Sequence, residues 1–160
     1  MNPGFDRLEA AGRIAALCDA LRNIPAPFAP CWRAKVQAVR EQIYYGWEKP
    51  QAGELIAGKY ERDGWWSEAA AALVLSNRFA ASSRQLARDH VRPVKNIVHE
   101  LLDKHMSREQ TAAFLAEQLE TCTLLAEEHA LLRGQDGWER YKRAEISVRH
   151  GLPRSIPRST

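Results

Sequence analysis

The sequence has few cysteines, and they are not paired. Its three cysteines, Cys18, Cys31 and Cys122, are widely spaced and form no CxxC motif. Disulfide scaffolds and structural zinc sites require closer, paired spacing. We therefore expect reduced thiols that behave as small apolar side chains.

The sequence also lacks a long apolar run. No uninterrupted apolar stretch approaches the roughly 18 residues that are needed to cross a bilayer. The first ten residues, MNPGFDRLEA, carry acidic side chains where a secretory signal has a basic and then an apolar region. These absences predict a cytoplasmic protein that does not bind a membrane.

Signatures of catalysis are scarce. Residues 53–60, GELIAGKY, resemble a nucleotide-binding P-loop, but Tyr60 occupies the position where a small hydroxyl must bind magnesium. No GxSxG elbow and no GxGxxG loop occurs. The sequence therefore predicts no cofactor and gives no support for an enzyme.

Metal-ligand spacing is absent as well. Residues 99–103, HELLD, begin like the HExxH motif of zinc proteases, but the fifth position is Asp103. His99 and Asp103 share a helical face, yet a metal site there needs a third ligand that the sequence does not identify. We therefore predict no metal site. A metal-dependent enzyme centred on His99 and Asp103 is therefore only a third hypothesis for function, after binding to a protein and binding to DNA.

Helical periodicity dominates what is present. Apolar residues recur every three or four positions in residues 5–24 and again in 32–47, and the proline-rich segment 25–30 separates the two stretches as an extended connector. Ser67 and Ser107 are suited to cap helices, the second of which is predicted to run over 107–133. Evidence for strands is thin.

These patterns predict a fold and a domain organisation. We expect a single all-α domain over residues 1–150, with five or six helices, one of them kinked near Pro93. Residues 151–160, GLPRSIPRST, contain two prolines and no apolar periodicity. They are predicted to form a flexible basic tail.

Two features suggest binding to another macromolecule. The formal net charge is only +3, but Arg84, Arg88, Arg92 and Lys95 form a basic island in which Asp89 is the single acidic residue. Trp65 and Trp66 lie in a charged, glycine-bounded stretch in which at least one ring is expected to be exposed. Tryptophan and arginine are enriched among binding hot spots. The sequence thus favours a non-enzymatic interaction module that binds a protein as an inhibitor, adaptor or regulator. The predicted contact residues are Trp65, Trp66, Arg84, Arg88, Arg92 and Lys95.

The alternative function is a DNA-binding transcriptional regulator. Residues 82–102 have the spacing of a helix-turn-helix, with Leu86 and Ala87 packing a first helix and Pro93 starting a second. The residues that would contact bases or phosphates are Arg92, Lys95, Asn96, Arg149 and Arg154. The predicted helix 107–133 also allows a homodimer, although its apolar stripe is too irregular for a coiled coil.

Overall fold

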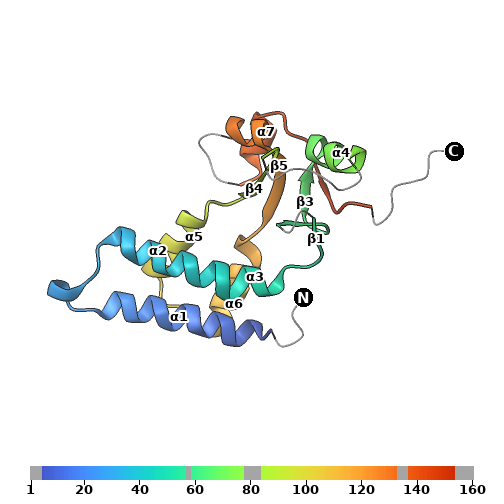
Figure 1. The fold of residues 1–160 in the computed structure, drawn as a ribbon. Coiled ribbons are helices and arrows are strands. Elements are labelled where there is room, and N and C mark those ends of the chain that lie inside the picture. Colours follow the sequence, from blue (N-terminus) through green and yellow to red (C-terminus); the bar gives the residue numbers. More distant parts are fainter. Residues whose placement is uncertain (1–4, 57–58, 78–83, 133–136, 154–160) are drawn as a thin grey trace. The chain divides into compact units, whose positions relative to one another are not determined.

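The computed structural model describes residues 5–56, 59–77, 84–132 and 137–153 (Figure 1). The chain divides into two compact units, each made of two segments. Residues Met1–Ala52 and Arg92–Glu120 form what we call the helical unit, and residues Gly53–Val91 and Thr121–Thr160 form what we call the sheet unit.

The described residues contain strands as well as helices, so the prediction of an all-α bundle is wrong. The strands are two to five residues long and pair with partners that are distant in sequence. Such short strands carry almost no periodicity of their own. Strand preference depends largely on cross-strand packing, which the sequence does not reveal.

The helical unit consists of two long antiparallel helices and the two helices that pack on them (Figure 1). Its elements are α1 (Arg7–Asn23), η1 (Ala26–Phe28), α2 (Trp32–Ile43), η2 (Tyr44–Glu48), α3 (Lys49–Gln51), α5 (Val94–Asp103) and α6 (Arg108–Gln118).

Local sequence explains where these helices begin. The Asp6 carboxylate caps α1 by accepting from the N–H groups of Leu8 and Glu9. Ser107 and Gln110 form a capping box at the start of α6, which confirms the predicted cap. The proline-rich connector, predicted to be extended, contains the short 3-10 turn η1.

The core of the helical unit forms where the apolar faces of α1, α2, α5 and α6 pack against one another. Its largest fully buried side chains are Ile14, Val39, Ile43, Ile97, Val98 and Leu115. α2 buries only one side, and the rest of that helix remains in solvent.

The described residues of the sheet unit form two sheets and three helices. Its elements are β1 (Leu55–Ile56), β2 (Tyr60–Glu61), β3 (Trp65–Ser67), α4 (Glu68–Ser76), β4 (Leu86–His90), β5 (Thr121–Leu125), α7 (Ala126–Leu131), α8 (Glu139–Arg143) and β6 (Val148–His150). β1 and β2 form an antiparallel pair, and the larger sheet has the order β4-β5-β3-β6. β3 runs parallel to β5, and the other two pairings are antiparallel.

Each face of the larger sheet has its own core. Trp66 lies on one face with the small residues of α4 and with Tyr60. Cys122 and Leu124 lie on the other face, under Tyr141 of α8. The Ser67 hydroxyl caps α4 by accepting from the N–H of Ala70, which confirms the predicted cap.

Two predicted helices are replaced by other elements. The segment 107–133 is not one helix, because β5 separates α6 from α7. β5, with the sequence TCTLL, bonds to strands on both sides, and this pairing overrides its marginal helical stripe. Residues 86–90 form β4, so the first helix of the predicted helix-turn-helix is a strand, and Pro93 precedes α5 instead of kinking a longer helix. Residues 82 and 83, where the predicted helix-turn-helix begins, lie outside the described residues.

The start of the predicted tail belongs to the sheet unit. Leu152 is buried, and its N–H donates to the carbonyl of Arg62 at 3.0 Å. Residues 154–160 lie outside the described part of the chain. Within the described residues, no helix combines the length and the apolar character that are needed to cross a membrane.

Candidate interaction surface

One side of α2 gathers polar and aromatic side chains at helical spacing. Arg33, Gln37 and Arg40 of α2 and Tyr44, the first residue of η2, follow one another at intervals of four, three and four residues, which places them on a single face. All four side chains are exposed, whereas Val39 and Ile43 lie on a neighbouring side of the helix and are buried in the core. We call these four residues, together with Tyr45 of η2 and with Trp32 on the flank that contacts α5, the α2 surface.

Exposed aromatic residues concentrate in this part of the chain. Among the described residues seven large hydrophobic side chains are exposed, and four of them fall between residues 28 and 45. Their exposed fractions are 79% for Phe28, 45% for Trp32, 44% for Tyr44 and 62% for Tyr45. Scattered exposed apolar residues are ordinary, but a local concentration of rings is typical of a binding surface.

The tyrosines at the end of α2 form a small ordered cluster. The ring centroids of Tyr44 and Tyr45 lie 4.8 Å apart in an edge-to-face arrangement. The Nζ atom of Lys49 lies 5.6 Å from the centroid of the Tyr45 ring. The cluster therefore combines apolar area with a positive charge.

The charges on the α2 surface are uncompensated. Within the described part of the chain, the side chains of Arg33 and Arg40 have no ion-pair or hydrogen-bond partner. The neighbouring acid, Glu41, accepts a hydrogen bond from Gln37 at 2.7 Å. An arginine that faces solvent in this way keeps all its donors available for a carboxylate or a phosphate.

Among the contacts within the described residues, Trp32 is the one member of the α2 surface whose side-chain polar atom bonds to another helix. Its Nε1–H donates to Nε2 of His99 on α5 at 3.2 Å. The two ring centroids lie 4.8 Å apart, with an angle of 81° between the ring planes. The contact holds part of the indole on α5 and leaves the remainder in solvent.

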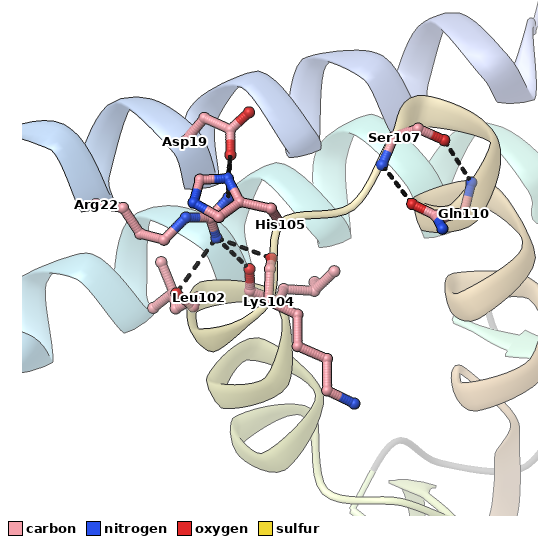
Figure 2. A network of polar contacts seen from close by, with 8 residues as sticks. Asp19, Arg22, Leu102, Lys104, His105, Ser107 and Gln110 are labelled. Carbon is pink, nitrogen blue, oxygen red and sulfur yellow. Dashed lines mark hydrogen bonds and ion pairs between the residues drawn. The ribbon is translucent and has the colours of Figure 1, made fainter.

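Other arginines of the helical unit are occupied within the fold. Figure 2 shows Arg22 of α1 at the C-terminal end of α5, where its Nη1 donates to the carbonyls of Leu101, Leu102 and Lys104 at 2.7, 3.2 and 3.0 Å. Asp19 pairs with Arg22 and with His105. This network satisfies the last carbonyls of a helix, which is a structural task.

The four residues of the basic island predicted from the sequence are divided between the two units. Arg84 and Arg88 belong to the sheet unit, whereas Arg92 and Lys95 belong to the helical unit. Arg92 donates to Glu100 at 2.8 Å and to Gln118 at 2.7 Å. Hydrogen bonds from Lys104 and from Arg92 lower the pKa of Glu100. Arg92 is thus an internal partner of α5 and α6.

The remaining residues predicted to contact DNA also belong to both units. Lys95 and Asn96 are exposed on the first turn of α5, and Arg149 is exposed on β6 with its Nη1 3.9 Å from Glu68. Arg154 lies outside the described residues. Because β4 replaces the first helix, α5 has no helix-turn-helix partner in front of it.

The two adjacent tryptophans point to opposite faces of β3. Trp66 is 0% exposed, and its Nε1–H donates to the carbonyl of Glu61 at 3.0 Å. Trp65 is half-buried against Trp138 and His150, with ring centroids 5.1 and 5.0 Å apart. Trp66 is therefore a core residue, and Trp65 offers only part of its ring to solvent.

A buried charge cluster holds β4 to α8 in the sheet unit. Asp89 accepts from the Tyr141 hydroxyl at 2.6 Å and pairs with Arg140, which also donates to the carbonyls of His90 and Val91. Burial raises the pKa of the Tyr141 hydroxyl, and the hydrogen bond to Asp89 raises it further. Nε2 of His129 lies 3.4 Å from Asp89 Oδ1. The cluster satisfies one buried carboxylate, and we assign it to stability.

Metal and thiol chemistry find no support in the described residues. No group of three or more His, Cys, Asp or Glu side chains there is arranged to hold a metal ion. His99 accepts from Trp32, and Asp103 is exposed one turn away. Burial raises the pKa of Cys18 to about 11 and that of Cys122 to about 12, so neither is a reactive thiolate near neutral pH.

Comparisons with family models, with curated proteins and with solved structures give no match for this chain. The sequence-based prediction did not include the α2 surface, although the spacing of residues 33, 37, 40 and 44 indicates a polar helical face.

Proposed function

We propose that this protein is an interaction module that binds an acidic protein surface through the α2 surface. The observation that carries the proposal is the concentration of exposed aromatic rings around two arginines, Arg33 and Arg40, whose side chains have no partner among the described residues. Tyrosine, tryptophan and arginine are the residues that most often dominate binding energy. Exposed guanidinium groups would select carboxylates on the partner.

Charge favours a protein partner over nucleic acid. The chain carries 23 basic and 20 acidic side chains, so its overall field is weak. Non-specific binding to DNA depends on neutralising many phosphates, which calls for a strongly basic face. Two arginines flanked by aromatic rings suit a short acidic and apolar segment of a protein instead.

The test begins with peptides selected for binding to the full chain from a random 12-residue library. We expect enrichment of peptides that combine Asp or Glu with aromatic or aliphatic residues. The strongest peptide is then synthesised with a fluorophore, and its Kd is measured by fluorescence anisotropy. The double substitution Arg33→Glu and Arg40→Glu should weaken binding at least about tenfold, because two attractive contacts become repulsive.

The matched control reverses the charge of two arginines elsewhere in the chain. Arg143→Glu with Arg149→Glu changes the net charge by the same amount on exposed residues of the sheet unit. This variant should bind the peptide within about twofold of the original chain. Equal losses in both double variants would show that net charge alone attracts the peptide, and the proposal would fail.

A nucleic-acid ligand is the other outcome that the test can reveal. A fluorescent 20-nucleotide oligo(dT) and a random DNA duplex are titrated with the same variants over a salt series. Tighter binding to either nucleic acid than to the peptide, lost in the Arg33 and Arg40 variant, would replace the acidic protein partner with nucleic acid.

A further inference from the structure

The aromatic ring at the start of α2 is held by a side chain that can change its charge. For Nε2 of His99 to accept from the indole N–H of Trp32, this nitrogen must carry no proton. His99 is then neutral, with its proton on Nδ1. Among the described residues Trp32 is the hydrogen-bond partner of this imidazole, so the state of His99 is coupled to one contact.

Protonation removes the acceptor. Nε2 becomes a donor, and two N–H groups then face each other across a distance that is 3.2 Å in the neutral form. We propose that protonation of His99 releases Trp32 from α5 and thereby strengthens binding at the α2 surface as the pH falls. This inference rests on the proposed function, because it describes how binding at the same surface is controlled.

The charged groups nearest to His99 along α5 are exposed or paired with other residues. On α5, Lys95 and Asp103 lie one turn before and one turn after His99, and both are exposed. Glu100 is engaged by Lys104 and Arg92. On α2, Lys35 lies one turn beyond Trp32, and from α1 the nearby cation Arg22 is committed to the end of α5.

Two consequences of release act in the same direction on an acidic partner. The freed indole can place its whole ring against the partner, and tryptophan is a frequent hot-spot residue. The imidazolium also adds one positive charge beside the surface. A hydrogen bond of this kind contributes a modest net free energy, so we expect the peptide affinity to rise about two- to tenfold when the pH is lowered from about 8 to about 5.

The first measurement needs no ligand. The indole ¹H–¹⁵N resonance of Trp32 is assigned in the full chain by comparison with Trp32→Phe and is followed from pH 8 to 5. We expect it to shift along a single titration curve. His99→Gln supplies a side-chain oxygen that accepts at every pH, so in that variant the resonance should not titrate. A resonance that stays constant in the original chain, or moves equally in His99→Gln, overturns the inference.

The second measurement uses the acidic peptide selected above. Its affinity should rise on acidification for the original chain and stay level for His99→Gln, while His99→Ala, which lacks the acceptor, should bind tightly at every pH. If Trp32 titrates but the peptide affinity does not change with pH, control of binding by His99 is disproved. The proposed function survives that result as long as the Arg33 and Arg40 variant weakens peptide binding at least about tenfold. If that variant binds normally, the proposed function has failed, whatever the resonance shows.

Discussion

Arginines in this protein serve two purposes, and their neighbours decide which. Arg22, Arg92 and Arg140 lie against carbonyls and carboxylates, where their donors satisfy groups inside the fold. Arg33 and Arg40 have the same chemistry but face solvent. Buried donors and acceptors must be paired, whereas an exposed guanidinium pays no such penalty and remains available to a partner.

Replacing Arg22 with alanine should destabilise the helical unit. The three carbonyls at the end of α5 would lose a charged donor in a site where the Arg22 side chain is only 16% exposed. We expect a loss of about 1–3 kcal/mol in the free energy of unfolding, measured with urea.

Arg13→Ala is the matched control, because Arg13 pairs with Glu9 on the surface of the same helix. The free energy of unfolding should change by less than about 0.5 kcal/mol, since exposed ion pairs contribute little. Equal effects of the two substitutions would show that Arg22 does no more than a surface charge.

At the scale of single elements, capping serines determine where two of the helices begin. Ser67 ends β3 and starts α4, and Ser107 starts α6. Both hydroxyls accept from a backbone N–H in the first turn of the helix. The two caps differ in burial, because Ser67 is 0% exposed and Ser107 lies in solvent.

The two serines should therefore respond differently to alanine. Ser67 also donates to Glu128 at 2.5 Å, and the same carboxylate accepts from the N–H of Leu125. Ser67→Ala leaves a part-buried carboxylate short of a donor and should cost about 2–3 kcal/mol in the free energy of unfolding. Ser107→Ala should cost about 1 kcal/mol.

Urea unfolding followed by circular dichroism provides the measurement. Ser67→Thr keeps the hydroxyl and serves as a second variant that preserves the cap. A Ser107→Ala loss equal to or greater than that of Ser67→Ala would contradict the importance assigned to the Glu128 contact.

At the scale of the whole molecule, the chain builds separate cores. The core of the helical unit and the two cores of the sheet unit share no residue. The second segment of each unit is reached only after the chain has passed through the other. We expect each unit to protect its own interior, so that the two open at different denaturant concentrations.

The reactivity of the buried cysteines shows whether the two units open at different denaturant concentrations. Cys18 is buried in the helical unit and Cys122 in the sheet unit, whereas Cys31 is exposed. Under native conditions near neutral pH, iodoacetamide should label Cys31 rapidly and the other two slowly, because burial raises the pKa of both buried thiols. Pulses of iodoacetamide across a urea series, read by mass spectrometry, should show Cys18 and Cys122 becoming reactive at different midpoints.

A Cys31→Ser variant removes the fast background and should leave both midpoints unchanged. Coincident midpoints for Cys18 and Cys122 would instead show one cooperative transition, as a single domain over residues 1–150 requires.

The helices with strong local signals could be predicted from the sequence. The periodic stripe of residues 5–24 corresponds to α1, and the serines at 67 and 107 cap α4 and α6 as predicted. These features depend on side chains within one or two turns of each other. The apolar face of α2 followed from the same period.

The other features of the fold and of the surface depend on contacts between residues that are far apart in the sequence. β5 bonds to β3 and β4, so five residues with a marginal helical stripe become a strand. Trp66 becomes a core residue because β3 turns it toward α4, and Arg92 is occupied because Glu100 and Gln118 come within reach. The sequence by itself determined the capped helices and their buried faces, since local hydrogen bonds and short-range periodicity suffice for both. The tertiary structure alone decided the sheet order and which arginines and aromatic rings remain exposed, because pairing and burial depend on partners far along the chain.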